Sequence, residues 1–152
     1  MKLYYLFNGL LLVFISCSES SEQIDYDQIT KEIITNSEQM ELLWNQGNLH
    51  AYMDFYYKSP SLLRMTNQEF INGWEQVFGR YLYINPSLEH LDKIKIVTET
   101  LDIINNQAAL HYGIRYYIDQ DNKIKSNESF SILWKQIEGE WLIVKIHTCE
   151  SQ

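Results

Sequence analysis

Three runs of alternating apolar and polar residues, separated by short turns, constrain the fold of this chain more than any other feature. They lie near residues 108–118, 126–136 and 140–148. Asp121-Asn122 and Glu138-Gly139 stand between them, and such residue pairs favour the tight turns of β-hairpins. The C-terminal part of the chain is therefore predicted to form an antiparallel meander.

The two turns also predict which residues of neighbouring strands face each other, because turn length sets the register of a hairpin. With two-residue turns, Arg115 lies opposite Glu128, and cross-strand partners share a sheet face. One face is then expected to carry His111, Gly113, Arg115, Glu128, Phe130, Ile132, Trp134, Trp141, Ile143, Lys145, His147 and Cys149. The other is expected to carry Tyr112, Ile114, Tyr116, Leu133, Leu142, Val144 and Ile146. Both faces are substantially apolar, so neither is predicted to be simply solvated.

Upstream of residue 86 the apolar residues recur mainly at helical spacing. A first helix is predicted from the stripe Ile29, Ile33, Ser37, Met40 and Trp44, with a stop at Gly47. Asn48 is expected to cap a short second helix with Leu49, Tyr52, Met53 and Tyr56 on one face. Helices followed by an antiparallel meander predict the α+β class, with the helices packed on one sheet face.

The segment between residues 60 and 98 supplies the remaining predicted elements. Residues 61–65 form a short predicted strand. Thr66 and Glu69 have the spacing of a capping box, which predicts a third helix. That helix would carry Phe70, Trp74, Val77, Phe78 and Tyr81 and end before Asn85-Pro86. Alternation at Ile94, Ile96 and Thr98 predicts a further strand.

The first sixteen residues have the pattern of a secretory signal. Lys2 precedes an apolar run from Leu3 to Ile15, which is too short for a permanent membrane span. Residues 14–17, Phe-Ile-Ser-Cys, resemble the lipobox of bacterial lipoproteins, although Phe stands where Leu is usual. We expect a signal peptide over 1–16, a lipid on Cys17, a tether over 17–25 and one domain over 26–152. The protein would then be anchored in the bacterial cell envelope, periplasmic or surface-exposed; an ordinary signal peptide cut near residue 16 is the alternative.

Charge and cysteine content exclude several classes of function. The formal net charge is -8 and the cationic residues are scattered, which argues against nucleic acid and against an anionic membrane surface. The only membrane contact expected is the lipid anchor. The four histidines are far apart and lack zinc-site spacing, so we expect neither a metal nor another cofactor. With Cys17 acylated, Cys149 has no partner for a disulfide within the chain.

Four segments together resemble the nuclear transport factor 2-like, or SnoaL-like, superfamily. They are Trp44–Leu62, Gly73–Pro86, Ser129–Trp134 and Gly139–Thr148. Within it they are most similar to a secreted Bacteroidetes branch known as domain of unknown function 4440. The resemblance implies a cone-shaped, cystatin-like fold in which N-terminal helices pack on a curved antiparallel sheet. It says little about activity, because this fold hosts isomerases, dehydratases, cyclases and binding or assembly modules.

The resemblance places Trp141, Ile143 and Phe130 toward the interior of the cone, and the predicted register then places Lys145 and His147 there too. The candidate ligand-pocket residues are His147, Lys145, Arg115, Glu128, His111, Phe130, Tyr52, Trp74 and Tyr81. Arg115, His111 and Lys145 would make the pocket positive, which suits a carboxylate or another anion. The alternative is structural: an Arg115–Glu128 ion pair, and a histidine satisfied by a neighbour at a strand end.

Two functions remain open at this point. The leading hypothesis is a domain without catalysis that binds a small molecule or serves as a dimeric assembly module. The alternative is a small isomerase, cyclase or dehydratase that uses His147 and Glu128; no catalytic motif supports it, and Arg115 would keep Glu128 occupied. Leu142, Ile146 and Ile114 replace polar positions of the family, which predicts a homodimer through the outer sheet face. A monomer with an apolar sheet is the alternative.

Overall fold

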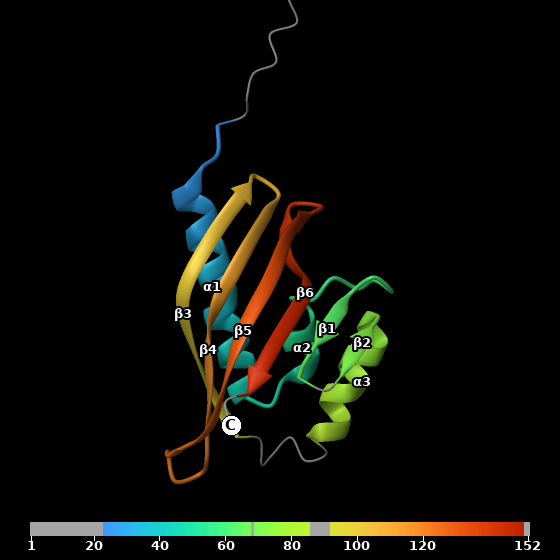
Figure 1. Ribbon diagram of the computed structural model, residues 1–152, viewed down its shortest axis with the longest axis vertical. Coiled ribbons are helices and arrows are strands. Elements are labelled where there is room, and N and C mark those ends of the chain that lie inside the picture. Colours follow the sequence, from blue (N-terminus) through green and yellow to red (C-terminus); the bar gives the residue numbers. More distant parts are fainter. Residues whose placement is uncertain (1–22, 68, 86–91, 151–152) are drawn as a thin grey trace, which may run out of the picture.

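The computed structural model describes residues 23–67, 69–85 and 92–150 of the chain. In chain order the elements are α1 (Tyr26–Asn45), α2 (Leu49–Met53), β1 (Leu63–Met65), β2 (Phe70–Asn72), α3 (Trp74–Ile84), β3 (Lys93–Asn105), β4 (Ala108–Ile118), β5 (Ile124–Ile137) and β6 (Glu140–Glu150) (Figure 1). The signal peptide expected over 1–16, the lipid site at Cys17 and Pro86 lie outside the described residues. No helix within the described ranges is long and apolar enough to cross a membrane.

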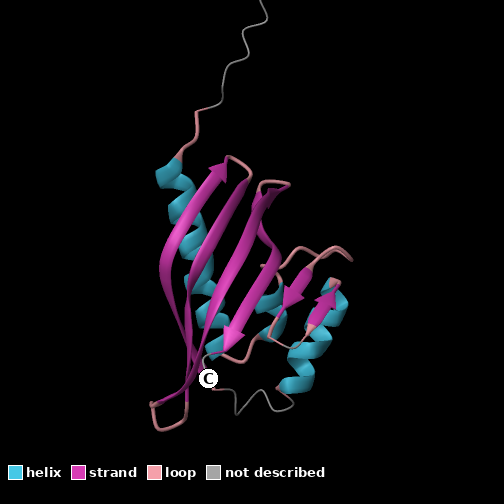
Figure 2. Ribbon diagram, viewed as in Figure 1, coloured by secondary structure: helices cyan, strands magenta, loops and turns pink. Residues whose placement is uncertain are grey.

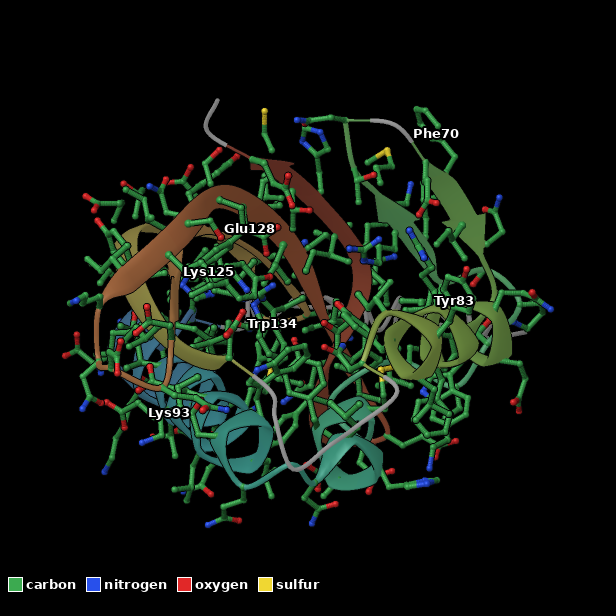
Figure 3. The ribbon with its side chains drawn as sticks, turned by 90° about the horizontal axis from the view of Figure 1, so that it is seen from below. Phe70, Tyr83, Lys93, Lys125, Glu128 and Trp134 are labelled. Carbon is green, nitrogen blue, oxygen red and sulfur yellow. The ribbon has the colours of Figure 1, made fainter. Side chains whose placement is uncertain are left out.

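The strands form one six-stranded sheet in the order β2-β1-β6-β5-β4-β3. Strands β3 to β6 are an antiparallel meander, β1 runs parallel to β6, and β2 pairs antiparallel with β1. The long strands curve, and the helices lie on one side of them (Figure 2). Seen from below, the sheet arches over α1 and α2, with Trp134 in the enclosed space (Figure 3). The predicted α+β class is confirmed, and the parallel β1 makes the sheet mixed rather than purely antiparallel.

The first two helices form where their caps and apolar stripes predict them. The Asp25 carboxylate accepts a hydrogen bond from Gln28 N at 3.0 Å, and the Asn48 side chain accepts one from Ala51 N at 3.2 Å. Gly47 has a φ of 71°, so the chain can turn sharply between the two helices. The whole predicted stripe of α1 is buried: Ile29, Ile33, Ser37, Met40 and Trp44.

The predicted capping box at Thr66 and Glu69 is wrong. Thr66 Oγ1 does accept from Glu69 N at 3.1 Å, but Thr66 N also donates to Glu69 O at 2.9 Å. These bonds close the turn between β1 and β2. The third helix begins only at Trp74, after Gly73, whose φ is 89°. Phe70, expected on the buried face of that helix, lies on β2 and is 75% exposed.

The β4–β5 hairpin has the predicted register over most of its length. Arg115 pairs with Glu128, and the pairing continues through Gly113 with Phe130 and through His111 with Ile132. The connection is longer than predicted, since β4 ends at residue 118 and β5 begins at 124. An irregularity at Tyr117/Ile118 absorbs the difference, so the faces of the two strands are still assigned correctly.

The β5–β6 hairpin follows the predicted register only near its turn. Glu138 and Gly139 have φ values of 54° and 90°, as a two-residue hairpin turn requires, and Trp134 pairs with Ile143. Between Leu133 and Trp134 the register then shifts, because Leu133 pairs with Lys145 and leaves Val144 as an extra residue of β6. One extra residue exchanges the two faces of the strand beyond it.

The bulge reverses the predicted orientation of every later residue of β6. Ile146 and Thr148 are buried on the inner side, whereas Lys145, His147 and Cys149 are exposed. The uninterrupted register would have placed a lysine and a histidine inside the cone and an isoleucine outside. The bulge avoids the cost of removing a charged ammonium from water and keeps the apolar side chain in the core.

Candidate functional site

A pocket of about 360 Å³ opens at one end of the cone, between the β1–β2 turn, the end of α3 and the two long strands β5 and β6. The residues that line it are Arg64, Thr66, Asn67, Glu69, Arg80, Ile84, Glu128, Thr148 and Glu150. Two of the three arginines of the chain line this pocket, and the third, Arg115, is paired with Glu128 behind it. We call this end of the cone the mouth.

Arg115 and Glu128 form a buried ion pair at the inner wall of the mouth. Their side chains are 4% and 5% exposed, and Arg115 Nη1 donates to Glu128 Oε1 at 2.6 Å. The hydroxyl of Tyr117, two residues along β4, donates to the same oxygen atom at 2.9 Å. Burial works to lower the pKa of Arg115, but Tyr52 and Glu128 nearby raise it well above its ordinary value. The guanidinium is therefore charged, and one oxygen of its carboxylate partner, Oε1, is already occupied.

The Arg115 guanidinium has more hydrogen-bond donors than the protein satisfies. Its Nε and Nη2 atoms are buried and have no hydrogen-bond partner among the described residues. The same is true of Nε of Arg64. Each guanidinium lies near an aromatic ring: Arg115 is 5.8 Å from the ring centroid of Phe130, and Arg64 is 5.3 Å from that of Tyr81. Rings near the cations help to hold the planar groups in place. Donors without acceptors therefore lie on Arg64, which lines the pocket, and on Arg115, which lies behind Glu128.

Three phenol groups line the interior beside these arginines. The hydroxyl of Tyr56 is 3.1 Å from that of Tyr52 and 3.3 Å from that of Tyr81. Burial, the largest cause, raises the pKa of Tyr52 and of Tyr56, and each is raised further by a neighbouring phenol. Burial likewise raises the pKa of Tyr117, against the lowering effect of Arg115. The phenols of Tyr52, Tyr56 and Tyr117 are therefore neutral at neutral pH.

His111 lies deeper in the cone and is fully satisfied. Its Nε2 is 2.9 Å from the hydroxyl of Thr98, and its Nδ1 is 3.5 Å from that of Ser37. Burial, with a smaller effect of Arg115, lowers the pKa of His111 from 6.5 to about 4. The ring is therefore neutral at neutral pH and packs edge-on against Phe130, with the centroids 5.0 Å apart. It serves the packing of the interior.

The structure brings together most, but not all, of the predicted pocket residues. Arg115, Glu128, Phe130, Tyr52 and Tyr81 converge near the mouth, with His111 behind them. Trp74 lies elsewhere: its indole N–H donates to Met53 O at 3.1 Å, its ring packs against Phe78, and Lys58 lies 5.4 Å above it. Trp74 is therefore a surface packing residue rather than part of the pocket.

Lys145 and His147 are not in the pocket, because the bulge at Val144 turns both outward. The expectation that they face the cone interior is wrong. Gly113 does not leave a space for a ligand either. A Cβ built on it would lie 2.3 Å from the carbonyl oxygen of Val97 and 2.6 Å from Cζ of Phe130, so the ring of Phe130 already fills the position.

Sequence reasoning missed Arg64, Tyr117 and Thr148 as residues of the mouth. Tyr117 has the same parity on β4 as Arg115, so the alternation that predicted one could have predicted the other. Arg64 faces inward because β1 pairs in parallel with β6, opposite Ile146. That long-range pairing leaves no local signal in a three-residue strand. Thr148 faces inward because of the bulge at Val144, which the predicted register lacks.

The arrangement favours binding of an oxygen acceptor over acid–base chemistry. A general base must be free to reach its proton, and Glu128 is held by Arg115 and Tyr117 through Oε1, so only its Oε2 could take that role. His147 is on the other face of the sheet and cannot act with it. Within the described ranges, no group of three or more His, Cys, Asp or Glu side chains could hold a metal ion.

Comparison with known proteins identifies the fold. No protein-family profile matches the sequence, and no curated protein matches it significantly. A nuclear transport factor 2-like protein of unknown function from Shewanella oneidensis MR-1 is 26% identical, with a TM-score of 0.74; the match covers 80% of this chain and 98% of that one. A protein of unknown function with a cystatin-like fold from Nostoc punctiforme matches at 10% identity and a TM-score of 0.65, covering 80% and 90% of the two chains.

A ketosteroid isomerase-like protein from Erwinia carotovora atroseptica is also similar in structure. It is 10% identical, with a TM-score of 0.66, and the match covers 84% of this chain and 99% of that one. At this identity the likeness concerns the fold alone. The chain therefore has the nuclear transport factor 2-like, cystatin-like fold, as the resemblance implied.

Proposed function

We propose that this domain is a binding module that holds a small molecule at the mouth of its cone through an oxygen atom of that molecule. One observation carries the proposal: Arg115 is 3% exposed, yet two of its guanidinium nitrogen atoms have no partner in the described part of the chain. A buried donor without an acceptor costs about 1–3 kcal/mol, and more when it is charged. A ligand oxygen would remove that cost.

Catalysis by the predicted pair is not supported. Glu128 is engaged by Arg115 and Tyr117, and His147 is exposed on the far side of the sheet. An isomerase of the kind found on this fold needs a free carboxylate beside a donor to the developing oxyanion. The mouth supplies buried donors, whereas its carboxylates are tied to arginines at Glu128 and Glu69 or exposed at Glu150, and that combination suits recognition.

A nuclear magnetic resonance titration of the purified protein tests this proposal. Small carboxylates, amides and alcohols at millimolar concentration should shift the backbone signals of Arg64, Glu128 and Thr148. Matched alkylamines, which have no acceptor oxygen, should not. Arg115→Lys keeps the charge but loses the planar fork, and should weaken the strongest of these interactions. Shifts confined to the outer sheet face, or no shifts at all, would oppose the proposal.

We also propose that the chain is a lipoprotein of the bacterial cell envelope and belongs to the secreted branch known as domain of unknown function 4440. The lipobox-like residues that end at Cys17 support the first part, and the four matching segments support the second. Labelling of cells with a radioactive fatty acid tests the anchor. Wild-type protein should take up the label and Cys17→Ala should not; label retained by that variant would refute the assignment.

A homodimer through the outer sheet face is a further part of the proposal. The side chains that support it are half-buried apolar groups on three neighbouring strands. They are Tyr112, Ile114, Tyr116, Leu133, Leu142 and Val144; Ile146, counted with them from the sequence, faces inward instead. Sedimentation at micromolar concentration should give a dimer, and Leu142→Glu should shift it to a monomer. A wild-type monomer would rule out this interface.

A further inference from the structure

The charges at the inner wall of the mouth, two of them buried and that of Arg64 half-buried, do not cancel. Arg115 and Glu128 form one pair. Arg64 lines the same pocket and forms no ion pair with any described carboxylate. Two guanidinium groups and one carboxylate leave a net charge of +1 at the inner wall. At the rim, Arg80 and Glu69 pair with each other at 2.9 Å, so they add nothing to this balance.

No other described group of the interior supplies the missing negative charge. The phenols of Tyr52, Tyr56 and Tyr117 are neutral at neutral pH, because burial raises the pKa of each. The remaining acid of the pocket, Glu150, is exposed at the end of β6, where solvent screens its charge. An uncompensated cation in a partly dry site is costly, and its cost falls when an anion binds.

The unpartnered donors lie on the same two arginines. Nε of Arg64 and both Nε and Nη2 of Arg115 are buried without partners in the described ranges. A guanidinium binds a carboxylate through two parallel N–H···O bonds, and two edge donors of Arg115 are free for this. The third arginine, Arg80, is already paired with Glu69. The remaining cationic residues of the described chain are lysines, and no lysine lines the pocket.

We propose that the ligand of the mouth is a small monocarboxylate, whose single negative charge balances the net +1 of Arg64, Arg115 and Glu128. This inference rests on the proposed binding function and adds the chemical class of the ligand. A neutral amide would satisfy a donor but leave the charge unbalanced. A dicarboxylate would bring a second negative charge close to Glu128, with no cation left to meet it.

Three ring compounds of similar shape test the inference: benzoate, benzamide and isophthalate, each titrated into the purified protein and followed by nuclear magnetic resonance. Benzoate should bind roughly tenfold tighter than benzamide or more, because charge-assisted hydrogen bonds are stronger than neutral ones. Isophthalate should bind no tighter than benzoate.

Variants with altered charge sharpen the test. Arg64→Gln lowers the net charge of the wall to zero, and should weaken benzoate about tenfold while leaving benzamide unchanged. Glu128→Gln raises the net charge of the wall to +2 and should make isophthalate the preferred ligand. If the second variant does not fold, the first still decides, because Arg64 lies outside the Arg115–Glu128 pair. Lys145→Gln makes the same change in total charge on the outer face and should leave all three affinities unchanged.

The outcomes separate the two proposals. If none of the three compounds binds, the binding function itself fails. If benzamide binds wild-type protein as tightly as benzoate does, or if Arg64→Gln leaves benzoate binding intact, the domain binds an oxygen acceptor but the monocarboxylate inference is wrong.

Discussion

The deep end and the mouth of the cone treat buried polar groups in opposite ways. His111 and Arg115 point inward from the same strand, four residues apart. At the deep end, both ring nitrogens of His111 meet a hydroxyl. Behind the mouth, two of the guanidinium nitrogens of Arg115 have no hydrogen-bond partner in the described protein. Buried polar groups in folded proteins are normally satisfied, so an unsatisfied pair beside an opening indicates a place for a ligand, whereas a satisfied one indicates structure.

The side chain of Trp134 is an exception to this contrast between satisfied and unsatisfied buried groups. The indole N–H of Trp134 is fully buried and has no partner in the described ranges. Nothing in the structure explains it. Unlike Arg115, Trp134 carries no charge and is not paired with a residue that lines the mouth pocket.

The largest expected effect on stability comes from removing the carboxylate at the mouth. Glu128→Ala leaves the Arg115 guanidinium buried without its counter-ion, and such a change typically costs about 3–5 kcal/mol. Urea denaturation monitored by circular dichroism measures the loss. Benzoate should restore part of the stability of this variant, because its carboxylate replaces the missing one. A loss below about 1 kcal/mol would mean that the pair is more solvated than its burial indicates.

The next effect belongs to the deep end and depends on pH. The folded protein lowers the pKa of His111 from 6.5 to about 4, so the unfolded chain takes up a proton first as the pH falls. Stability should therefore be complete above pH 6.5 and decrease as the pH falls toward 4, by about 3 kcal/mol for this group.

His111→Gln serves as the control for that titration, since carboxylates also titrate in the acidic range. The stability difference between wild type and variant, measured by urea denaturation at several pH values, should shrink as the pH falls from 6.5 to 4. A difference that stays constant over this range would show that His111 is not held neutral.

A smaller effect is expected for the chain of phenols between the two ends. Tyr56→Phe removes the middle hydroxyl and leaves those of Tyr52 and Tyr81 without this partner. The free energy of unfolding should fall by about 1 kcal/mol. Tyr83→Phe makes the same chemical change at a residue that is 78% exposed, and should have no measurable effect. Equal effects of the two variants would argue against the buried chain.

The smallest effect is expected on the outer face of β6. His147→Ala should change stability by less than about 0.5 kcal/mol, as is usual for exposed positions, and should leave benzoate binding unchanged. A loss of binding in this variant would return His147 to the pocket and contradict the register found here.

The register of β6 also shows how far sequence reasoning reaches. Alternation and turn residues predicted the meander and placed Arg115 opposite Glu128, because both signals are local and period-two. They could not predict the bulge at Val144, which exchanges the faces of Lys145 and Ile146. Nothing in the alternating pattern signals one extra residue.

The prediction of a capping box at Thr66 and Glu69 was wrong for a related reason. A hydroxyl that accepts from the N–H three residues later occurs both at a helix start and in a tight turn. The backbone pairing of β1 with β2 and β6 decides between them here, and that pairing is long-range. The same pairing turns Arg64 inward. The position of Arg64 on β1 could therefore not be predicted from the sequence, whereas the pairing of Arg115 on β4 with Glu128 on β5 could.

Arginine side-chain signals give the most direct test of the central claim, that the mouth binds a ligand oxygen through its unpartnered guanidinium nitrogens. The chain has three arginines, so selectively labelled protein gives one Nε–H signal for each. Nε of Arg80, at the rim of the same pocket, already donates to Glu69 at 2.9 Å, whereas Nε of Arg64 and of Arg115 have no partner among the described residues. On titration with benzoate, the Arg64 and Arg115 signals should move together and saturate, and should move farther than that of Arg80. If only the Arg80 signal moves, a ligand binds the rim without the unpartnered nitrogens and the claim is wrong; if all three remain unchanged at saturating benzoate, the mouth is not the binding site.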